Sequence, residues 1–274
     1  MTVETHDGIR RVGKFAFYYC TSLRQINFKS AIEIAFQAFF GCENLESVEF
    51  GDRLEIIGGY AFSRCASLTH VKLPSIITIG RHAFYRSERL IDVELSERLE
   101  TIGRSVFSSC ERLQRIAMPM KRDLFEFSDF YGRYTQFDKC WQLTTVDLIG
   151  GIHKSVASLH MESWRTEMIT EINRINQVLP ITHAEKTEEI RQWIGMVLDK
   201  LDHYKSEHCR YVKEGITLLE LALWKAKLGE KEEYAVEMSS KKAKIDTEST
   251  RKERRITCGA DMVIKNVLPF LQLE

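Results

Sequence analysis

The chain has 274 residues, of which 44% are hydrophobic, so it can form two domains of ordinary size and is not an intrinsically disordered chain. Its 39 basic residues balance 39 acidic residues, and the halves on either side of residue 150 are each neutral. This balance excludes a protein that acts mainly through nonspecific attraction to phosphate backbones or anionic membranes.

The sequence also lacks the usual marks of export or membrane insertion. The N-terminus has no basic stretch followed by an apolar run, and the longest apolar stretch, residues 215–224, is far too short to span a membrane. The seven cysteines are odd in number and no pair is spaced CxxC. We therefore expect a soluble, cytoplasmic protein with reduced thiols. The basic segment at residues 239–255 leaves a nuclear location open.

The first half of the chain repeats one motif. Five copies follow I-x-x-I-G-x-x-A-F-x-x-C-x-x-L-x-x-V-x-L with small departures, for example IITIGRHAFYRSERLIDVEL at residues 76–95, and a degenerate sixth copy follows them. The copies recur at first every 22 or 23 residues. The cysteine position of the six copies is occupied by Cys20, Cys42, Cys65, Ser87, Cys110 and Cys140.

Each copy contains segments with different roles. The end of L-x-x-V-x-L alternates apolar and polar residues, which predicts a short strand with residues such as Val71 and Leu73 facing inward. Glycines such as Gly58 and Gly80 predict a bend where a side chain would not fit. Ala-Phe supplies a small residue for close approach and a large ring for the interior. No copy can bury its apolar face alone, so the copies must stack around one core.

The motif resembles the leucine-rich repeat of the BspA-like family over residues 9–148. The resemblance implies an α/β solenoid over residues 1–150, a short right-handed stack of about six repeats with a parallel sheet on one face. The sixth copy has Asp129 and Gly132 where two isoleucines are expected, and we interpret it as the transition into a cap. The first eight residues contain no apolar capping segment, so what covers that end stays open.

Helical periodicity replaces the repeat and predicts an α-helical domain over residues 151–274. An apolar stripe over residues 164–179 predicts one helix that Pro180 ends, and a second stripe over residues 190–204 predicts a longer one. This second helix either continues to Leu228 or breaks near Gly215.

The end of the chain gives further predictions. Residues 216–224 are apolar on nearly all sides, which predicts the centre of a helical bundle. Residues 239–255 carry seven basic and three acidic residues and predict an exposed charged linker, whose spacing also fits a nuclear-import signal. Residues 258–273 predict a short apolar helix that returns to the bundle. Residues 150–228 also resemble a region of leucine-rich-repeat proteins of diatoms, which implies no activity.

The repeated cysteines are candidates for catalysis, metal binding, disulfides or packing. Their common register places them on the inner side of the solenoid, where a free cysteine behaves as a small apolar residue. Their side chains would run parallel, which is unfavourable for a disulfide torsion of about 90°. No copy has a distinguishing adjacent base, so we predict that the cysteines serve packing.

Two weaker patterns predict other functions. Asp199, His203 and Glu207 share a face of the second predicted helix, next to His208 and Cys209, a pattern that can build part of a zinc site although the HExxH order is missing. A metal-dependent enzyme hosted in the helical domain, using His203, Glu207 and Cys209, is therefore one alternative, and a solvated helix face explains the pattern equally well. Weak nucleic-acid binding through residues 239–255, a segment without aromatic residues, is another.

The sequence GGIHKS at residues 150–155 has a faint likeness to the end of a phosphate-binding loop. Its glycine spacing is wrong, and His153 replaces the glycine before Lys154. We interpret it as a turn that joins the two predicted domains.

The open face of the predicted sheet is the main candidate site. The residues that flank each inward valine point outward, and their charges vary from strand to strand. Such a surface suits selective recognition of a protein or peptide, and a merely solvated sheet face explains it equally well. We predict a noncatalytic interaction or scaffold module without a cofactor, whose protein or peptide partner and oligomeric state stay open. The predicted contact residues are Gln25, Asn27, Ser47, Glu49, His70, Lys72, Asp92, Glu94, Arg115, Thr145 and Asp147.

Overall fold

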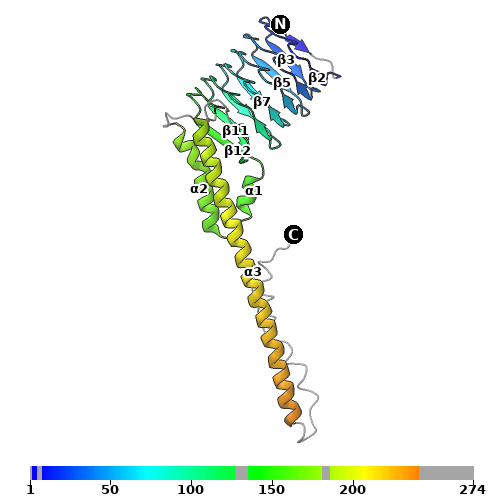
Figure 1. Ribbon diagram of the computed structural model, residues 1–274, viewed down its shortest axis with the longest axis vertical. Coiled ribbons are helices and arrows are strands. Elements are labelled where there is room, and N and C mark those ends of the chain that lie inside the picture. Colours follow the sequence, from blue (N-terminus) through cyan, green and yellow to red (C-terminus); the bar gives the residue numbers. More distant parts are fainter. Residues whose placement is uncertain (1, 5–7, 127–134, 181–185, 241–274) are drawn as a thin grey trace. The chain divides into compact units, whose positions relative to one another are not determined.

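The computed structural model describes residues 2–4, 8–126, 135–180 and 186–240, and Figure 1 shows its stacked strands and its helices. The repeats form a parallel β-solenoid that helices follow, as the sequence predicts. The V-x-L segments form two sheets, which we call the open-face sheets, in the orders β1-β3-β5 and β7-β9-β11-β12. Their strands are β1 (Thr2–Glu4), β3 (Gln25–Phe28), β5 (Ser47–Phe50), β7 (His70–Lys72), β9 (Asp92–Glu94), β11 (Arg115–Pro119) and β12 (Thr145–Ile149).

A second set of strands, which the sequence did not predict, comes from the I-x-x-I segments. They pair in parallel, in register, as one narrow sheet in the order β10-β8-β6-β4-β2. Its strands are β2 (Arg11–Val12), β4 (Glu33–Ile34), β6 (Ile56–Ile57), β8 (Thr78–Ile79) and β10 (Thr101–Ile102). The glycine after β8 is needed because a Cβ on Gly80 would lie 2.6 Å from the backbone nitrogen of Gly59 in the preceding turn.

The core of the solenoid is a continuous stack of phenylalanine rings. The rings of Phe39, Phe62 and Phe84 are parallel to within 7°, with centroids 5.0 and 5.4 Å apart, and all three side chains are fully buried. Phe17 extends the stack at one end and Phe107 and Phe137 extend it at the other. The Ala-Phe motif of each turn thus continues the core of its neighbours.

The cysteine position joins consecutive turns. The thiol of Cys65 donates a hydrogen bond to the carbonyl oxygen of Phe39 at 3.3 Å, and the hydroxyl of Ser87 donates the same bond to Phe62 at 3.1 Å. Cys42, Cys110 and Cys140 repeat this contact with the turns before them. These residues are buried, so the predicted packing role is confirmed, and a hydrogen bond adds to it.

This bond predicts an unusual order of stability among variants at Cys65. Serine and alanine have nearly the same volume, and an apolar buried site would favour alanine. We expect Cys65→Ser to be more stable than Cys65→Ala by about 1 kcal/mol, because only serine keeps a donor for the Phe39 carbonyl. Chemical denaturation measures the difference, and Ser87→Cys should be close to neutral. A more stable Cys65→Ala variant would mean that the thiol serves packing alone.

The sixth turn departs from the predicted alignment. Phe125, rather than Gly132, lies beside Ile102 of the preceding turn, and the Ile102 N–H donates to the Leu124 carbonyl oxygen at 2.7 Å. The chain therefore reaches the narrow-sheet position earlier than predicted. Asp129 and Gly132 lie outside the described residues.

Three helices follow β12: α1 (Ile152–Ala157), α2 (Glu162–Val178) and α3 (Lys186–Ser240). The chain divides into two compact units, residues 1–204 and 205–274. Met168 and Ile175 of α2 and Trp193 of α3 belong to the same buried cluster as the solenoid core. These contacts show that the two predicted apolar stripes are buried in the same core as the solenoid. The predicted domain boundary at residue 150 stays a prediction.

The helices of the first unit supply hydrogen-bonding groups to the last turns of the solenoid. The Val146 N–H of β12 donates to the side-chain oxygen of Asn176 at 2.8 Å, and the Phe137 N–H donates to the Thr187 hydroxyl at 2.9 Å. Lys186 is buried and donates to the carbonyl oxygens of Trp141 and Leu143, while burial lowers its pKa. The helices thus act as the predicted cap.

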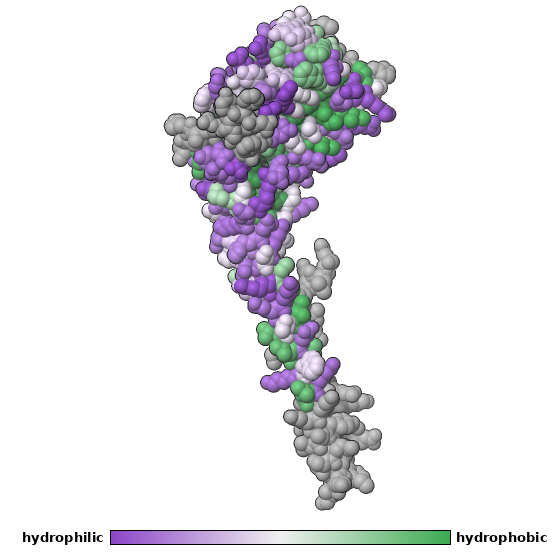
Figure 2. Space-filling view, in the orientation of Figure 1, coloured by the Kyte–Doolittle hydropathy of each residue, from purple (hydrophilic) through white to green (hydrophobic). Residues whose placement is uncertain are grey.

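In the second unit, α3 continues without a break past Gly215 to Ser240. Ile216, Leu218 and Trp224 are exposed, and Figure 2 shows hydrophobic residues at the surface along this part of α3. The prediction that residues 216–224 form a bundle centre is therefore wrong, because no second helix of the described residues covers them. Residues 241–255 of the predicted linker and the closing segment at 258–273 lie outside the described residues.

No helix in the described ranges is both long enough and apolar enough to cross a membrane.

Candidate functional site

The parallel register of the open-face sheets arranges the predicted contact residues in rows. Gln25 lies beside Ser47 and Asn27 beside Glu49 on β3 and β5. His70, Asp92, Arg115 and Thr145 form one row across β7 to β12, and Lys72, Glu94, Ala117 and Asp147 form the other. The residues between the two rows, Val71, Val93, Ile116 and Val146, are buried. The structure therefore brings the predicted residues together on one face in two blocks, since the hydrogen-bonded ladder is interrupted between β5 and β7.

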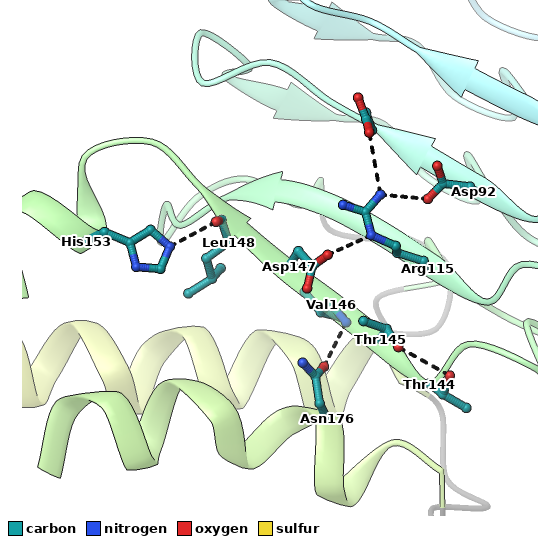
Figure 3. Close-up of polar contacts among 10 residues, drawn as sticks. Asp92, Arg115, Thr144, Thr145, Val146, Asp147, Leu148, His153 and Asn176 are labelled. Carbon is teal, nitrogen blue, oxygen red and sulfur yellow. Dashed lines mark hydrogen bonds and ion pairs between the residues drawn. The ribbon is translucent and has the colours of Figure 1, made fainter. Parts of the chain in front are cut away.

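Arg115 is the centre of the second block (Figure 3). Its guanidinium group donates to Asp92 at 2.8 Å and to Asp147 at 2.6 Å, and it lies 3.7 Å from Glu94. Ala117, between Glu94 and Asp147, is small and buried, which leaves room for the Arg115 side chain. The hydrogen bonds to Asp92 and Asp147 raise the pKa of Arg115, so this cation is fixed at all ordinary pH values.

The neighbouring charges on this face are also paired. Lys72 lies 3.0 Å from Glu94, and its hydrogen bond, together with Arg115, holds the pKa of Glu94 below its usual range. In the first block, the Asn27 amide donates to Glu49 at 2.7 Å. The face is therefore an ordered array of partly exposed ion pairs with little net charge, which the sequence alone shows only as alternating signs.

Two predicted contact residues contribute in other ways. His70 is exposed, and its Nδ1 lies 3.0 Å from the Thr69 hydroxyl, which restrains the orientation of the ring. Thr145, at the end of its row, lies beside Thr144, with 3.5 Å between the two hydroxyl groups. Both positions carry a hydrogen-bonding side chain beside the ion pairs of this face.

The alternative metal site does not form from its predicted residues. Asp199 pairs with Arg122 at 2.7 Å and Glu207 pairs with Arg210 at 2.5 Å, while His203 is exposed. Across the part of the chain that the structure describes, no three His, Cys, Asp or Glu side chains are grouped as metal ligands. These residues are those of a solvated helix face.

The buried thiols are poor nucleophiles. Burial raises the pKa of Cys42 and of Cys110 to about 12 and also raises those of Cys65 and Cys140. They stay protonated near neutral pH, and a thiol must lose its proton to attack an electrophile. Catalysis through these four buried thiols is therefore not supported.

Only Gly150 and Gly151 of the GGIHKS segment form the turn between β12 and α1, and Ile152 to Ser155 are the first residues of α1. Gly150 has a φ of +90°, and a Cβ there would lie 3.1 Å from the Glu97 carboxyl carbon. A His153 ring nitrogen lies 3.2 Å from the Leu148 carbonyl oxygen, so the ring folds back on the strand (Figure 3). The interpretation of the whole segment as a turn is therefore correct only for its two glycines, and both β12 and α1 belong to the first compact unit.

Comparisons with known proteins agree with the repeat. A profile of the BspA type leucine rich repeat region matches residues 10–136 and 79–181, with six copies in all. A leucine-rich-repeat protein of T. pallidum shares 23% identity, with a TM-score of 0.46 over 62% of this chain and 82% of that chain. A leucine rich cell surface protein from Faecalibacterium prausnitzii shares 17% identity, with a TM-score of 0.23 over 56% and 80%.

No curated protein matches the sequence. The profile nevertheless covers more than half of the residues, and it does so over the same turns that the structure stacks into a solenoid. The repeat fold it describes is typically protein-binding and usually noncatalytic. On this evidence, the chain belongs to the BspA-type leucine-rich-repeat family.

Proposed function

We propose that this protein is a noncatalytic interaction module whose protein or peptide partner binds the open-face sheets. The observation that supports the proposal is the paired array around Arg115, in which each charged side chain already has a fixed neighbour. Side chains that are ordered before binding lose less conformational entropy when a partner arrives.

The array also favours selective recognition over general attraction. Because the charges of Lys72, Asp92, Glu94, Arg115 and Asp147 largely cancel, a partner gains little from net charge alone. It must instead present charges in the complementary order, since like charges placed opposite one another cost affinity. The partner class that fits is a folded protein or peptide with a mixed-charge surface.

Crosslinking can identify the partner and locate its site in one experiment. A photoreactive amino acid at Ser47 would lie on the open face, and the same residue at Ile56 would lie on the narrow sheet at a comparably exposed control position. We expect one protein to crosslink through Ser47 and not through Ile56. Equal crosslinking from both positions would contradict the proposed face.

A charge swap then tests recognition without leaving a charge unpaired. Lys72→Glu with Glu94→Lys keeps an ion pair across β7 and β9 but reverses its direction. We expect it to weaken binding of the crosslinked partner at least tenfold, measured by calorimetry, and to lower the unfolding free energy by no more than about 1 kcal/mol, because a lysine at position 94 would face Arg115 at a partly exposed site. The matched control is Arg11→Glu with Glu33→Arg, which reverses an exposed pair of the narrow sheet. Unchanged affinity in the first variant, or equal losses in both, would reject the proposal.

A further inference from the structure

A second surface of the solenoid combines aromatic rings with unbalanced positive charge. It comprises residues 14–19, 36–41, 59–64, 81–86 and 104–109, which lead from the narrow sheet to the cysteine position of each turn, and we call it the arc surface. Although the whole chain is neutral, these segments contain no acidic residue. Their basic residues are Lys14, Arg64, Arg81, Arg86 and Arg104.

Some arginines elsewhere on the solenoid are held in ion pairs, whereas three arginines of the arc surface lie against aromatic rings. Arg11, Arg24 and Arg98 each pair with a glutamate of another turn. In contrast, no ion pair is found among the described residues for Arg64, Arg81 or Arg86. Each of these lies over an aromatic ring: Arg64 lies 5.6 Å from the ring centre of Phe40, Arg81 5.9 Å from that of Tyr60 and Arg86 5.5 Å from that of Tyr85.

The aromatic residues are exposed mainly in the first turn. Phe15, Tyr18 and Tyr19 are 50%, 43% and 45% exposed, and Figure 2 shows hydrophobic residues at the solenoid surface among hydrophilic ones. The Tyr18 ring stacks on Phe40 at 5.3 Å, and it meets the Phe15 and Tyr19 rings edge to face. Farther along, Tyr60 stacks on His82 at 4.6 Å. The pKa of His82 is lowered by burial and by the charges of Arg81 and Arg104, as expected where positive charge accumulates.

The backbone of the arc surface is left-handed at two positions of each turn. Phe15, Tyr19, Tyr60, Arg64 and Arg86 all have φ between 53° and 59°, a left-handed conformation that glycine adopts at far lower cost. Gly41 occupies the same position in the second turn, with φ of 72°, so the fold accepts glycine there. Gln37, Ser105 and Ser109 have the same conformation at equivalent positions, so the repeat imposes it and holds the backbone under the rings and guanidinium groups in a fixed conformation.

We propose that the arc surface binds an acidic peptide segment of a partner protein. Carboxylates would pair with Arg64, Arg81 and Arg86, and apolar side chains of the segment would contact the exposed rings of the first turn. A single-stranded nucleic acid is less suitable, because bases need free ring faces for stacking, whereas the faces of Tyr18 and Tyr60 already lie against Phe40 and His82.

Fluorescence anisotropy with three probes tests the charge and the chemistry of the ligand. The probes are a short fluorescein-labelled peptide of alternating glutamate and tyrosine, its lysine and tyrosine counterpart, and labelled oligothymidylate. We expect the full-length protein to bind the acidic peptide, with affinity that falls as salt is added, and to bind the other two at least tenfold more weakly. No binding of the acidic peptide, or tighter binding of oligothymidylate, would overturn the proposal.

Charge variants locate the site. Arg64→Glu with Arg86→Glu should weaken binding of the acidic peptide at least tenfold, while Lys29→Glu with Arg53→Glu, the same charge change at exposed positions outside the arc surface, should have less than a threefold effect. Equal losses in the two variants would show that only net charge matters and would reject the site.

Two further variants separate this site from folding and from the open face. Arg64→Gly with Arg86→Gly removes both charges at positions where glycine relieves strain, so it should weaken binding at least threefold without lowering the thermal midpoint. The Lys72→Glu and Glu94→Lys swap on the open face should bind the acidic peptide like the unaltered protein. Full binding by the glycine variant, or lost binding by the swap variant, would contradict a separate arc site.

Discussion

Replacing Phe62 with alanine should lower the free energy of unfolding by about 3 to 5 kcal/mol. Phe62 is fully buried between Phe39 and Phe84, whose ring centres lie 5.0 and 5.4 Å away. The turns on either side are held by backbone hydrogen bonds, such as that from the Phe39 N–H to the Ala61 carbonyl oxygen at 2.7 Å. The cavity therefore cannot collapse easily, and chemical denaturation with a cooperative fit should show the full loss.

Phe17→Ala provides the matched control. Phe17 belongs to the same stack, with its ring 4.8 Å from Phe39, but it is only partly buried at the end of the row. We expect less than half of the loss found for Phe62→Ala, because fewer contacts are removed and water can fill the space. Equal losses at the two positions would argue against a core whose stability depends on rings packed on both sides.

Thr187→Val tests the cap and should cost about 1 to 3 kcal/mol. The Thr187 side chain is fully buried, and its hydroxyl accepts the Phe137 N–H at 2.9 Å. Valine has the same shape but no acceptor, so it leaves a buried N–H without a partner. Denaturation gives the total loss, and hydrogen exchange should show faster exchange at the Phe137 amide in the last turn than at amides of the central turns.

Thr187→Ser is the control for shape. Serine keeps the acceptor and loses only a methyl group, so it should retain most of the protection at Phe137 even if some stability is lost. If valine and serine behaved alike in hydrogen exchange, the contact would be one of packing, and the last turn would be closed by the remaining cap residues Lys186 and Asn176.

Much of the solenoid could be predicted because its periodicity is enforced by burial. A shift of one residue would expose Val71 and bury Lys72, so the alternating pattern specifies which residues point inward. The common register of the cysteines similarly identified a buried position before any contact was known. The hydrogen bond from Cys65 to Phe39 was harder to anticipate, although Ser87 at the same position was a signal that a donor is needed.

Other features depend on distances that a linear pattern does not contain. Strands of two residues, such as Ile56–Ile57, are too short to show a period. Lys72 and Glu94 become neighbours only because successive turns stack in register. The rings and arginines of the arc surface occupy the variable positions of the motif, and only the left-handed backbone of residues such as Tyr60 and Arg64 shows that these positions are constrained.

The hydrogen bonds at the cysteine position also determine whether the number of repeats in such a protein can change without disrupting the fold. Each thiol or hydroxyl donates to the turn before it, and every internal turn offers the same Phe carbonyl to the turn after it. Removing or duplicating one whole internal repeat would leave every donor with an acceptor of the same kind, and Thr187 and Lys186 would still close the final turn. Both the open-face sheets and the arc surface can thus be lengthened or shortened in steps of one repeat, with the chemistry of the junctions conserved.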